Sequence, residues 1–378
     1  NTTVARQCDP YSSEPDSDDM ENAFDSGALV VVAAGNRGNE GICNMDHPAD
    51  TPKAFTVNSI DTSKAKSACR DNYSVCEVSY GASARGGARY PNASGTNRDV
   101  TLVDLIAPTR MSYSSNCRIR PWGETEYAYS DSFTFVNPFA ENKEGTVAQD
   151  SDGSSFAAPH VAGAAIVMKE KMLADGVVNV NAPGALHTIM LAMGDRYSNT
   201  INSPRDIGGN PWSGFGRLKL RMISPFVSFP TVATGYAMHR YVFTHGSASQ
   251  AFMAFPKPLP SGANFLKCVS FNAEDVSEVP VMSHIQLTVQ ARAKTCVLGT
   301  IYNCFEWACT QGAPTGQGTK VDDFRDWKHM IAYEEFEMPA FRNQCVGIVL
   351  NPIQVPAGKS VTTSVFCYFN NRSDREVY

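Results

Sequence analysis

The stretch Asp152–Gly163, with the sequence DGSSFAAPHVAG, constrains the fold of this chain more than any other. Glycine and alanine surround a pair of serines, and the apolar segment Val161–Met168 follows at once. This pattern predicts a tight loop that delivers Ser155 to the first turn of a buried helix. Unpaired backbone N–H groups and the positive end of the helix dipole at that position stabilise negative charge near the serine hydroxyl.

The same stretch resembles the nucleophile motif of subtilisin-like serine proteases, whose usual form is Gly-Thr-Ser-Met-Ala-Ala-Pro-His-Val-Ala-Gly. Ser154 stands where threonine is commonest, Phe156 stands where methionine is commonest, and the other positions match. The resemblance implies that Ser155 forms an acyl-enzyme during peptide hydrolysis, and that His160 is a structural part of the motif. The residues alone leave a second interpretation open, a helix start that simply requires small side chains.

A second stretch, Gly27–Gly38, favours the enzymatic interpretation. Its β-branched apolar run has the length of a strand and ends at Gly35 and Asn36. It resembles the subtilisin segment in which a strand ends at the asparagine of the oxyanion hole. The Asn36 amide and the Ser155 backbone N–H are then expected to hold the oxygen that becomes negative when serine attacks a carbonyl. In subtilisin itself, loss of that asparagine lowers turnover roughly 100- to 1,000-fold.

The resemblance implies an α/β subtilisin-like fold, a parallel sheet flanked by helices, whose N-terminal part is missing from this chain. It also implies that Ala33, Ala34 and Gly35 line one wall of the pocket for the substrate residue before the scissile bond. We expect this catalytic part to occupy residues 1–223. From residue 224 to 378, strand-like alternation between clusters of Gly, Pro and Asn predicts an all-β, sandwich or jelly-roll-like domain.

Local signals predict several elements of the first part. Asp18 and Glu21 form a capping-box pattern that predicts the start of a short helix, and Asn181 is expected to cap another. His187 lies on that second helix and is expected to pack. Other expectations concern whole segments: family-like strands within 47–61 and 103–108, an exposed loop over 82–98, and an insertion near the substrate cleft over 111–148.

Composition and charge exclude several classes of function. The net charge of −6 and the lack of a Lys/Arg cluster argue against a nucleic-acid partner. No apolar run approaches the length of a membrane span. The 11 cysteines are too many for idle use in a cytosolic chain. With them, four Asn-x-Ser/Thr sequons favour a secreted glycoprotein; these begin at Asn1, Asn72, Asn92 and Asn371.

No metal or cofactor is required by the predicted chemistry. The cysteines do not recur as close Cys-x-x-Cys pairs, so we predict no metal-ligand set. The acidic run at Asp18 could suggest calcium, but charge that complements a helix dipole is the better interpretation. Structural calcium is frequent in the resembled family, and that resemblance leaves room for it here.

The predicted serine lacks its base and the acid that orients the base. In the resembled family, the order along the chain is Asp, His and then Ser, with Asp and His well upstream of the oxyanion asparagine. Here only 35 residues precede Asn36, and they contain no histidine and no His-Gly-Thr segment. We therefore expect Asn1 to be a processed end and an upstream chain of the same precursor to carry Asp, His and the missing strands. Since the number of cysteines is odd, one of them, with Cys8 nearest the cut, is expected to bridge to that partner.

Two other interpretations remain open from the sequence. The chain could be a catalytically inactive subtilase-like glycoprotein with a structural or binding role in an extracellular assembly. A circularly permuted or truncated enzyme could instead take its histidine from residues beyond 224, which would place a residue of the β domain in the cleft. The favoured interpretation is the two-chain endopeptidase described above, whose substrate is a polypeptide.

Overall fold

A computed structural model of the chain describes about half of the sequence, and the account below is confined to that half. The described residues are 15–38, 44–51, 53–61, 78–79, 83–84, 87–91, 97–108, 111–112, 150–151, 153–177, 179–195, 214–218, 236–246, 250–254, 265–273, 283–292, 320–322, 332–337 and 345–370.

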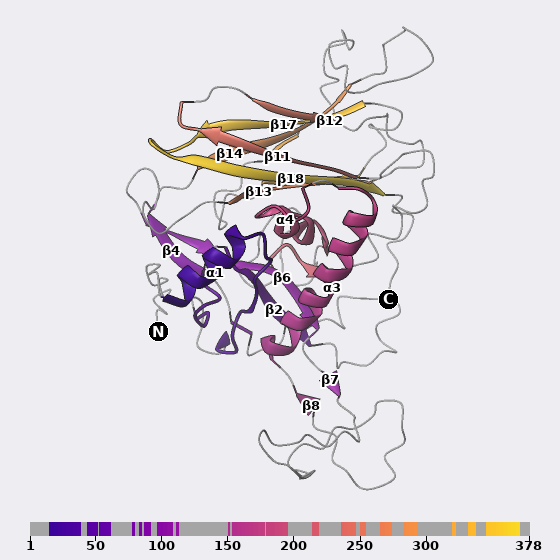
Figure 1. The fold of residues 1–378 in the computed structure, drawn as a ribbon. Helices are drawn as coiled ribbons and strands as arrows, with labels where there is room; N and C mark the ends of the chain where they lie inside the picture. The colour runs from indigo at the N-terminus through magenta and orange to yellow at the C-terminus, as the bar shows by residue number, and fades with distance from the viewer. Residues whose placement is uncertain are drawn as a thin grey trace, which may run out of the picture.

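A mostly parallel sheet forms the centre of the first part of the chain (Figure 1). Its strand order is β1-β2-β6-β10-β9, with β3 paired antiparallel to β2 and β9 paired antiparallel to β10. Strands β1 and β6 are mostly apolar, and residues 55–60 of β2 are buried although several are polar, as suits a parallel sheet covered on both faces. The bounds are β1 Val31–Ala33, β2 Phe55–Asp61, β3 Val78–Ser79, β6 Val103–Pro108, β9 Gly194–Asp195 and β10 Arg217–Leu218. The strands expected within 47–61 and 103–108 are confirmed.

Three helices accompany this sheet: α1 (Pro15–Asp25), α3 (Ser154–Ala174) and α4 (Ala185–Ala192). The long helix α3 packs against β1, β2 and β6. Small residues on its inner face, among them Ala157, Ala158, Ala164 and Ala165, let its backbone come close to the sheet. The predicted buried helix that begins at the paired serines is therefore present.

The predicted helix starts are wrong by a few residues. Asp18 does not cap α1, because the helix already begins at Pro15 and Asp18 lies in its first turn. Asn181 does not cap α4, because Gly184, with a φ of 78°, takes the cap position. Both positions carry good capping side chains, but the chain enters each helix from a different residue.

The exposed loop expected over residues 82–98 is also wrong in part. Strands β4 (Gly87–Pro91) and β5 (Asn97–Thr101) form an antiparallel pair, and Ser83 and Ala84 are completely buried. Strands β7 (Met111–Ser112) and β8 (Asp150–Ser151) form a second antiparallel pair at the two ends of the expected insertion.

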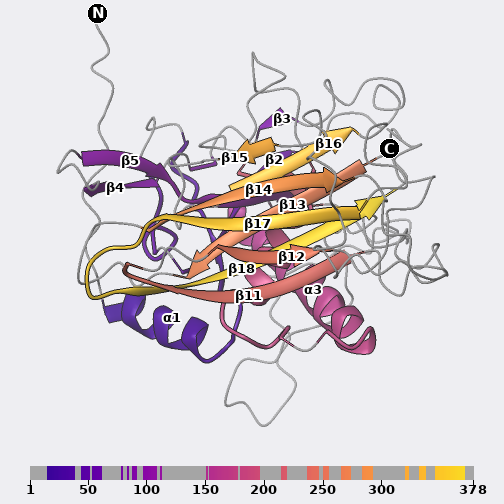
Figure 2. The same ribbon diagram turned by 90° about the horizontal axis from the view of Figure 1, so that it is seen from above.

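The described residues beyond 224 form two antiparallel sheets of four strands each. Figures 1 and 2 show the sheets stacked in layers. The first sheet has the order β11-β18-β13-β16, and the second has the order β12-β17-β14-β15. The bounds are β11 Tyr236–Thr244, β12 Ala251–Ala254, β13 Phe265–Ala273, β14 His284–Arg292, β15 Lys320–Asp322, β16 Ala332–Glu337, β17 Cys345–Gln354 and β18 Ser360–Asn370.

One disulfide joins neighbouring strands of the first of these sheets. Cys268 of β13 lies opposite Cys367 of β18 in the register, and the two sulfurs are bonded. Nine of the 11 cysteines contribute no described side chain, so their pairing, including the bridge predicted for Cys8, stays a prediction.

The sheet β11-β18-β13-β16 packs directly on the α/β part through helix α4. Alternate residues of β13 face that helix: Val269 and Phe271 join the same buried apolar cluster as Phe24 and Ile189. The buried Lys267 of β13 donates a hydrogen bond to the carbonyl oxygen of Gly194 in β9. The described parts on either side of residue 224 thus share one hydrophobic core.

His187 occupies the centre of this shared core, and its expected packing role is confirmed. It is fully buried, and its ring stacks on Phe271 with 4.0 Å between centroids. Its Nε2 lies 3.5 Å from Oδ1 of Asp104, whose Oδ2 accepts a 2.6 Å hydrogen bond from the Thr56 backbone N–H. His187 therefore connects α4 to β6, to β2 and to the antiparallel sheet.

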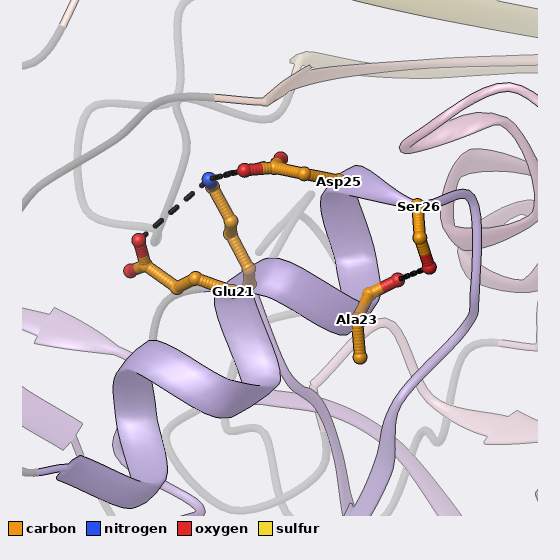
Figure 3. A network of polar contacts seen from close by, with 5 residues as sticks. Glu21, Ala23, Asp25 and Ser26 are labelled. Carbon is orange, nitrogen blue, oxygen red and sulfur yellow. Dashed lines mark hydrogen bonds and ion pairs between the residues drawn. The ribbon is translucent and has the colours of Figure 1, made fainter.

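Helix α1 is fixed to the parallel sheet by a lysine. Lys53, at the start of the β2 segment, pairs with Asp25 at 3.0 Å and with Glu21 at 3.6 Å. Figure 3 shows the carboxylates of Glu21 and Asp25 turned toward the same nitrogen. The same ammonium lies 5.7 Å from the centre of the Phe24 ring. Glu21 thus serves this buried ion pair rather than the predicted capping box.

We expect the substitution Phe271→Ala to loosen helix α4 as well as β13, because the ring contacts His187 inside the shared core. Phe→Ala substitutions in cores cost about 3–5 kcal/mol. Hydrogen exchange of the intact protein should show faster exchange of the amides of residues 185–192. Phe243→Ala is the matched control, since this buried ring of β11 lies outside that cluster. Equal protection of α4 in wild type and Phe271→Ala would contradict a shared core.

Candidate active site

The candidate site lies where helix α3 begins beside the end of strand β1. Gly153 precedes the helix with a φ of 132°, a conformation that other residues rarely adopt. Gly153 has no side chain to cap the helix, and the first helical N–H, that of Ser154, donates instead to the side chain of Asn36. Ser155 stands in this first turn and is exposed, whereas Ser154 before it is fully buried.

Ser154 fastens the start of α3 to the end of β1. Its hydroxyl accepts a 3.0 Å hydrogen bond from the Gly35 backbone N–H and lies 3.3 Å from Oδ1 of Asn36. Its own backbone N–H donates a 2.9 Å hydrogen bond to the same Oδ1. These contacts join residues 118 and 119 positions apart in the chain. We call this set of contacts among Gly35, Asn36 and Ser154 the serine clamp.

The serine clamp fixes the orientation of the Asn36 amide. A backbone N–H can donate only to the oxygen of an amide side chain, so Oδ1 faces Ser154 and the two Nδ2 donors point in another direction. An added Cβ on Gly153 would lie 3.0 Å from Nδ2 of Asn36, so glycine leaves the space that this side chain needs. Asn36 is exposed, as is Ser155. The site therefore presents an amide donor next to a helix N-terminus and a serine.

Strand β1 leads into the site through residues 33–35. Ala34 is fully buried, Ala33 is half-buried, and Gly35 has a φ of 100°. The Gly35 carbonyl oxygen accepts a 3.0 Å hydrogen bond from the backbone N–H of Ala84. The three residues expected to line a pocket thus form the end of β1 and the turn into Asn36, and their binding role stays a prediction.

The turn that follows the site folds back onto the end of β1. Its residue Asp46 donates a 3.2 Å backbone hydrogen bond to the carbonyl oxygen of Ala34. The Asp46 carboxylate packs against Gly35, where Oδ2 would lie only 2.4 Å from an added Cβ. Arg37 forms a 3.0 Å ion pair with the other carboxylate oxygen. Neither Asp46 nor the clamping role of Ser154 was foreseen from the sequence.

None of the described histidine contacts involves Ser155. His160, five residues along α3, is hydrogen-bonded through Nδ1 to the Phe156 carbonyl oxygen at 2.8 Å, as expected for a structural residue of the motif. The other described contacts are those of His47 with Asp50, His187 with Asp104 and Phe271, His239 with Tyr241, and His245 with the Val355 carbonyl oxygen. Within the described part of the chain, no histidine contact therefore accompanies the predicted nucleophile Ser155, and the roles predicted for Ser155 and Asn36 stay predictions.

Several predicted site residues cannot be placed. The four sequon asparagines lie outside the described residues. No cluster of three His, Cys, Asp or Glu side chains suited to a metal occurs in the described ranges. In the same ranges, no helix combines the length and the apolar character of a membrane span.

Comparison with known proteins gives one match to a family. A sequence model described as the subtilase family matches residues 3–185, a range that contains β1, Asn36 and the start of α3. No curated protein matches the chain.

Two solved structures were found among the matches. One is the prenylagaramide maturation protease PagA, with 16% sequence identity, coverage of 58% of each chain and a TM-score of 0.32. The chain thus spans little more than half the length of that protein. The other is the mitogen YPM from Yersinia pseudotuberculosis, with 10% identity, coverage of 37% of this chain and 89% of that chain, and a TM-score of 0.22.

We expect Ser154→Ala to weaken the site without removing the nucleophile. The substitution leaves the buried Gly35 N–H without its hydroxyl acceptor, which costs about 1–3 kcal/mol, and it releases one contact to Asn36. Denaturant unfolding of the intact protein should show this loss. Ser154→Thr is the matched control, because threonine keeps the hydroxyl and should restore most of the stability. Equal stability of all three proteins would show that the serine clamp contributes nothing.

Proposed function

Because this chain belongs to the subtilase family through residues 3–185, we propose that it is the serine-bearing part of a secreted serine endopeptidase. The family is one of serine peptidases, so the broad activity follows from membership. The observation that supports this chain's own part in it is the serine clamp, which fixes Oδ1 of Asn36 on Ser154 and leaves Nδ2 next to Gly153, at the start of the helix that carries Ser155.

In the proposed reaction, the Ser155 hydroxyl attacks the carbonyl carbon of a polypeptide substrate while a histidine takes its proton. The carbonyl oxygen becomes negative and is held by Nδ2 of Asn36 and the Ser155 backbone N–H. The histidine then gives its proton to the departing amine, which leaves an acyl-enzyme on Ser155. Water, activated by the same histidine, hydrolyses that ester and regenerates the serine. These steps require no metal or organic cofactor.

The histidine and its aspartate are proposed to come from an upstream chain of the same precursor. The outer face of α3 supports such a partner. Its exposed residues recur at spacings of three and four and begin at Ser155 itself. The large apolar side chains among them are Ile166, Val167 and Leu173, with 61%, 51% and 48% exposure, and Glu170 lies between them. Large apolar side chains on a helix are normally buried, and a partner that covered this face would reach the first turn, where Ser155 lies.

The half-exposed strand β1 gives independent support to the same partner. Val31, Val32 and Ala33 are apolar, yet all three remain partly exposed, and among the described strands β1 has only β2 beside it. A parallel sheet is normally covered on both faces and continued by further strands. The missing strands of the proposed upstream chain would complete this edge.

The cellular location and the second domain are further parts of the proposal. The Cys268–Cys367 disulfide fits an oxidising compartment, and so do the four sequons. We take residues 224–378 as a β-sandwich domain on the two stacked antiparallel sheets. Its close packing on α4 favours a stabilising role over that of a loosely tethered module.

The proposal predicts that a fluorophosphonate probe labels Ser155 in the natively purified protein, because such probes react only with an activated serine. Ser155→Ala should abolish labelling. Asn36→Ala should retain the serine but lower the turnover of a peptide substrate about 100- to 1,000-fold, as expected for a lost oxyanion donor. Native protein that stays unlabelled beside a reactive control protease would contradict the proposed activity.

The proposed docking of an upstream chain is tested by placing a charged side chain on the exposed face of α3. Ile166→Glu should weaken association with the upstream chain at least about tenfold and reduce labelling of Ser155, because a buried unpaired charge is costly. Val242→Glu is the matched control, since Val242 on β11 is 66% exposed and far from α3 in sequence. Unchanged copurification of a second chain with the Ile166→Glu protein would exclude this face as the docking surface.

The second candidate function is that of a catalytically inactive glycoprotein in an extracellular assembly. It is favoured by one observation, that none of the histidine contacts described in the structure involves Ser155. Mass spectrometry of native material without reduction separates the two functions further. A companion chain that carries Asp and His supports the enzyme, and the absence of any companion supports the inactive protein.

A further inference from the structure

Asn58 lies fully buried in the middle of strand β2 and takes no direct part in the proposed reaction. Strands of a parallel sheet that are covered on both faces are usually filled with aliphatic residues. A buried amide destabilises the fold unless its polar atoms are hydrogen-bonded. The partners of Asn58 therefore indicate what this side chain contributes.

Both polar atoms of the Asn58 side chain are hydrogen-bonded. Its Oδ1 accepts a 3.0 Å hydrogen bond from the Ser59 backbone N–H, so its Nδ2 is the atom that donates to the Ala84 carbonyl oxygen, at 2.6 Å. The hydroxyl of Ser59 is hydrogen-bonded to that of Ser83, which also donates to the Ser59 carbonyl oxygen at 3.2 Å. All four residues are fully buried. Strand β2 thus fastens the segment 83–84 through two neighbouring side chains.

The segment 83–84 extends this connection to the end of β1. The Ala84 backbone N–H donates a 3.0 Å hydrogen bond to the Gly35 carbonyl oxygen. That carbonyl belongs to the peptide unit that joins Gly35 to Asn36. The N–H of Gly35 belongs to the peptide unit before it and is held by the serine clamp. The hydrogen bonds that start at Asn58 thus reach the main chain at the base of the Asn36 side chain, while the serine clamp holds its amide at the tip.

The backbone freedom of Gly35 makes this second attachment important. Its φ of 100° lies in a region that other residues rarely adopt, and glycine has the most permissive backbone of all residues. If the Gly35 carbonyl lost its donor, the peptide unit that carries Asn36 could rotate, and the amide would move with it. Donors of an oxyanion site act at about 2.7–3.1 Å from the negative oxygen, and a misplacement of about 1 Å can lower a rate about 100-fold.

We propose that Asn58 is a positioning residue of this peptidase. By holding Ala84, it keeps the Gly35–Asn36 peptide unit in one orientation. The amide donors of Asn36 are thereby placed for the carbonyl oxygen that becomes negative when the serine attacks. Asn58 acts through the main chain and not by contact with the substrate. This inference rests on the proposed peptidase function and adds to it a residue inside the sheet on which the rate depends.

The test measures two inhibition constants on the native, fully processed protein. A peptide aldehyde is attacked by Ser155, whose oxygen bonds to the aldehyde carbon and whose proton passes to the base, while the carbonyl oxygen becomes negative. The matching peptide alcohol binds in the same place but forms no such oxygen. Asn58→Leu keeps the approximate volume of the side chain and removes its hydrogen bonds. It should weaken aldehyde binding and lower kcat about 10- to 100-fold, and it should leave alcohol binding and KM within about threefold. Since inhibition constants do not depend on the fraction of protein that is folded, destabilisation alone cannot produce this difference.

Thr56→Val is the matched control. Thr56 is buried in the same strand, and its hydroxyl donates to the Ala49 carbonyl oxygen at 2.8 Å, so the substitution removes a buried hydrogen bond that does not lead to the segment 83–84. It should leave both inhibition constants unchanged. Asn58→Ala removes the amide without adding bulk and should repeat the result of Asn58→Leu.

Equal aldehyde binding by wild type and the two Asn58 variants would overturn the inference. Loss of the fold in both Asn58 variants while Thr56→Val folds would also overturn it, because Asn58 would then be a purely structural residue. In either case, a wild-type protein that cleaves peptides and prefers the aldehyde retains the peptidase function. A wild type that neither cleaves peptides nor prefers the aldehyde over the alcohol overturns the peptidase function and the positioning role together.

Discussion

The site depends on one set of contacts, the hydrogen bonds of Ser154 to Gly35 and Asn36. They bring the end of β1 to the beginning of α3 although more than a hundred residues separate the two segments. They also decide which atom of the Asn36 amide faces outward, because only its oxygen can accept from the Ser154 N–H. The proposed nucleophile, the proposed amide donor and the N-terminus of α3 are thereby held together by contacts within the chain itself. Such preorganisation is the main source of oxyanion stabilisation in enzymes.

The same geometry is consistent with the proposal that a second chain completes the catalyst. The histidine contacts described in the structure are with groups other than Ser155, and α3 and β1 expose apolar side chains. An assembly that brings a second polypeptide to this surface would supply the base and cover the surface in one step. Activity would then depend on association, while the core around His187 holds the antiparallel sheets on the opposite side of α4.

Much of the site was predictable because it is encoded in continuous stretches. Small residues around Ser155 indicated a helix start, and the apolar run before Asn36 indicated a strand. The contact between these two stretches could not be predicted from local sequence, since Ser154 and Gly35 meet only in the folded chain.

The N-caps predicted at Asp18 and Asn181 were wrong for a related reason. A capping preference of about 1 kcal/mol is readily outweighed by the path of the chain and by partners such as Lys53. The paired strands within 87–101 were missed because their Gly- and Asn-rich sequence resembles a loop.

The most direct test of this account is an experimental structure of the native protein after reaction with a phosphonate inhibitor. The account predicts a phosphorus–oxygen bond to Ser155, with the phosphoryl oxygen about 3 Å from both Nδ2 of Asn36 and the Ser155 backbone N–H. It also predicts that Oδ1 of Asn36 still accepts from the Ser154 N–H, and that a histidine from outside this chain lies beside the serine oxygen. An adduct whose phosphoryl oxygen points away from Asn36, or an Asn36 amide turned with Oδ1 toward the adduct, would contradict it.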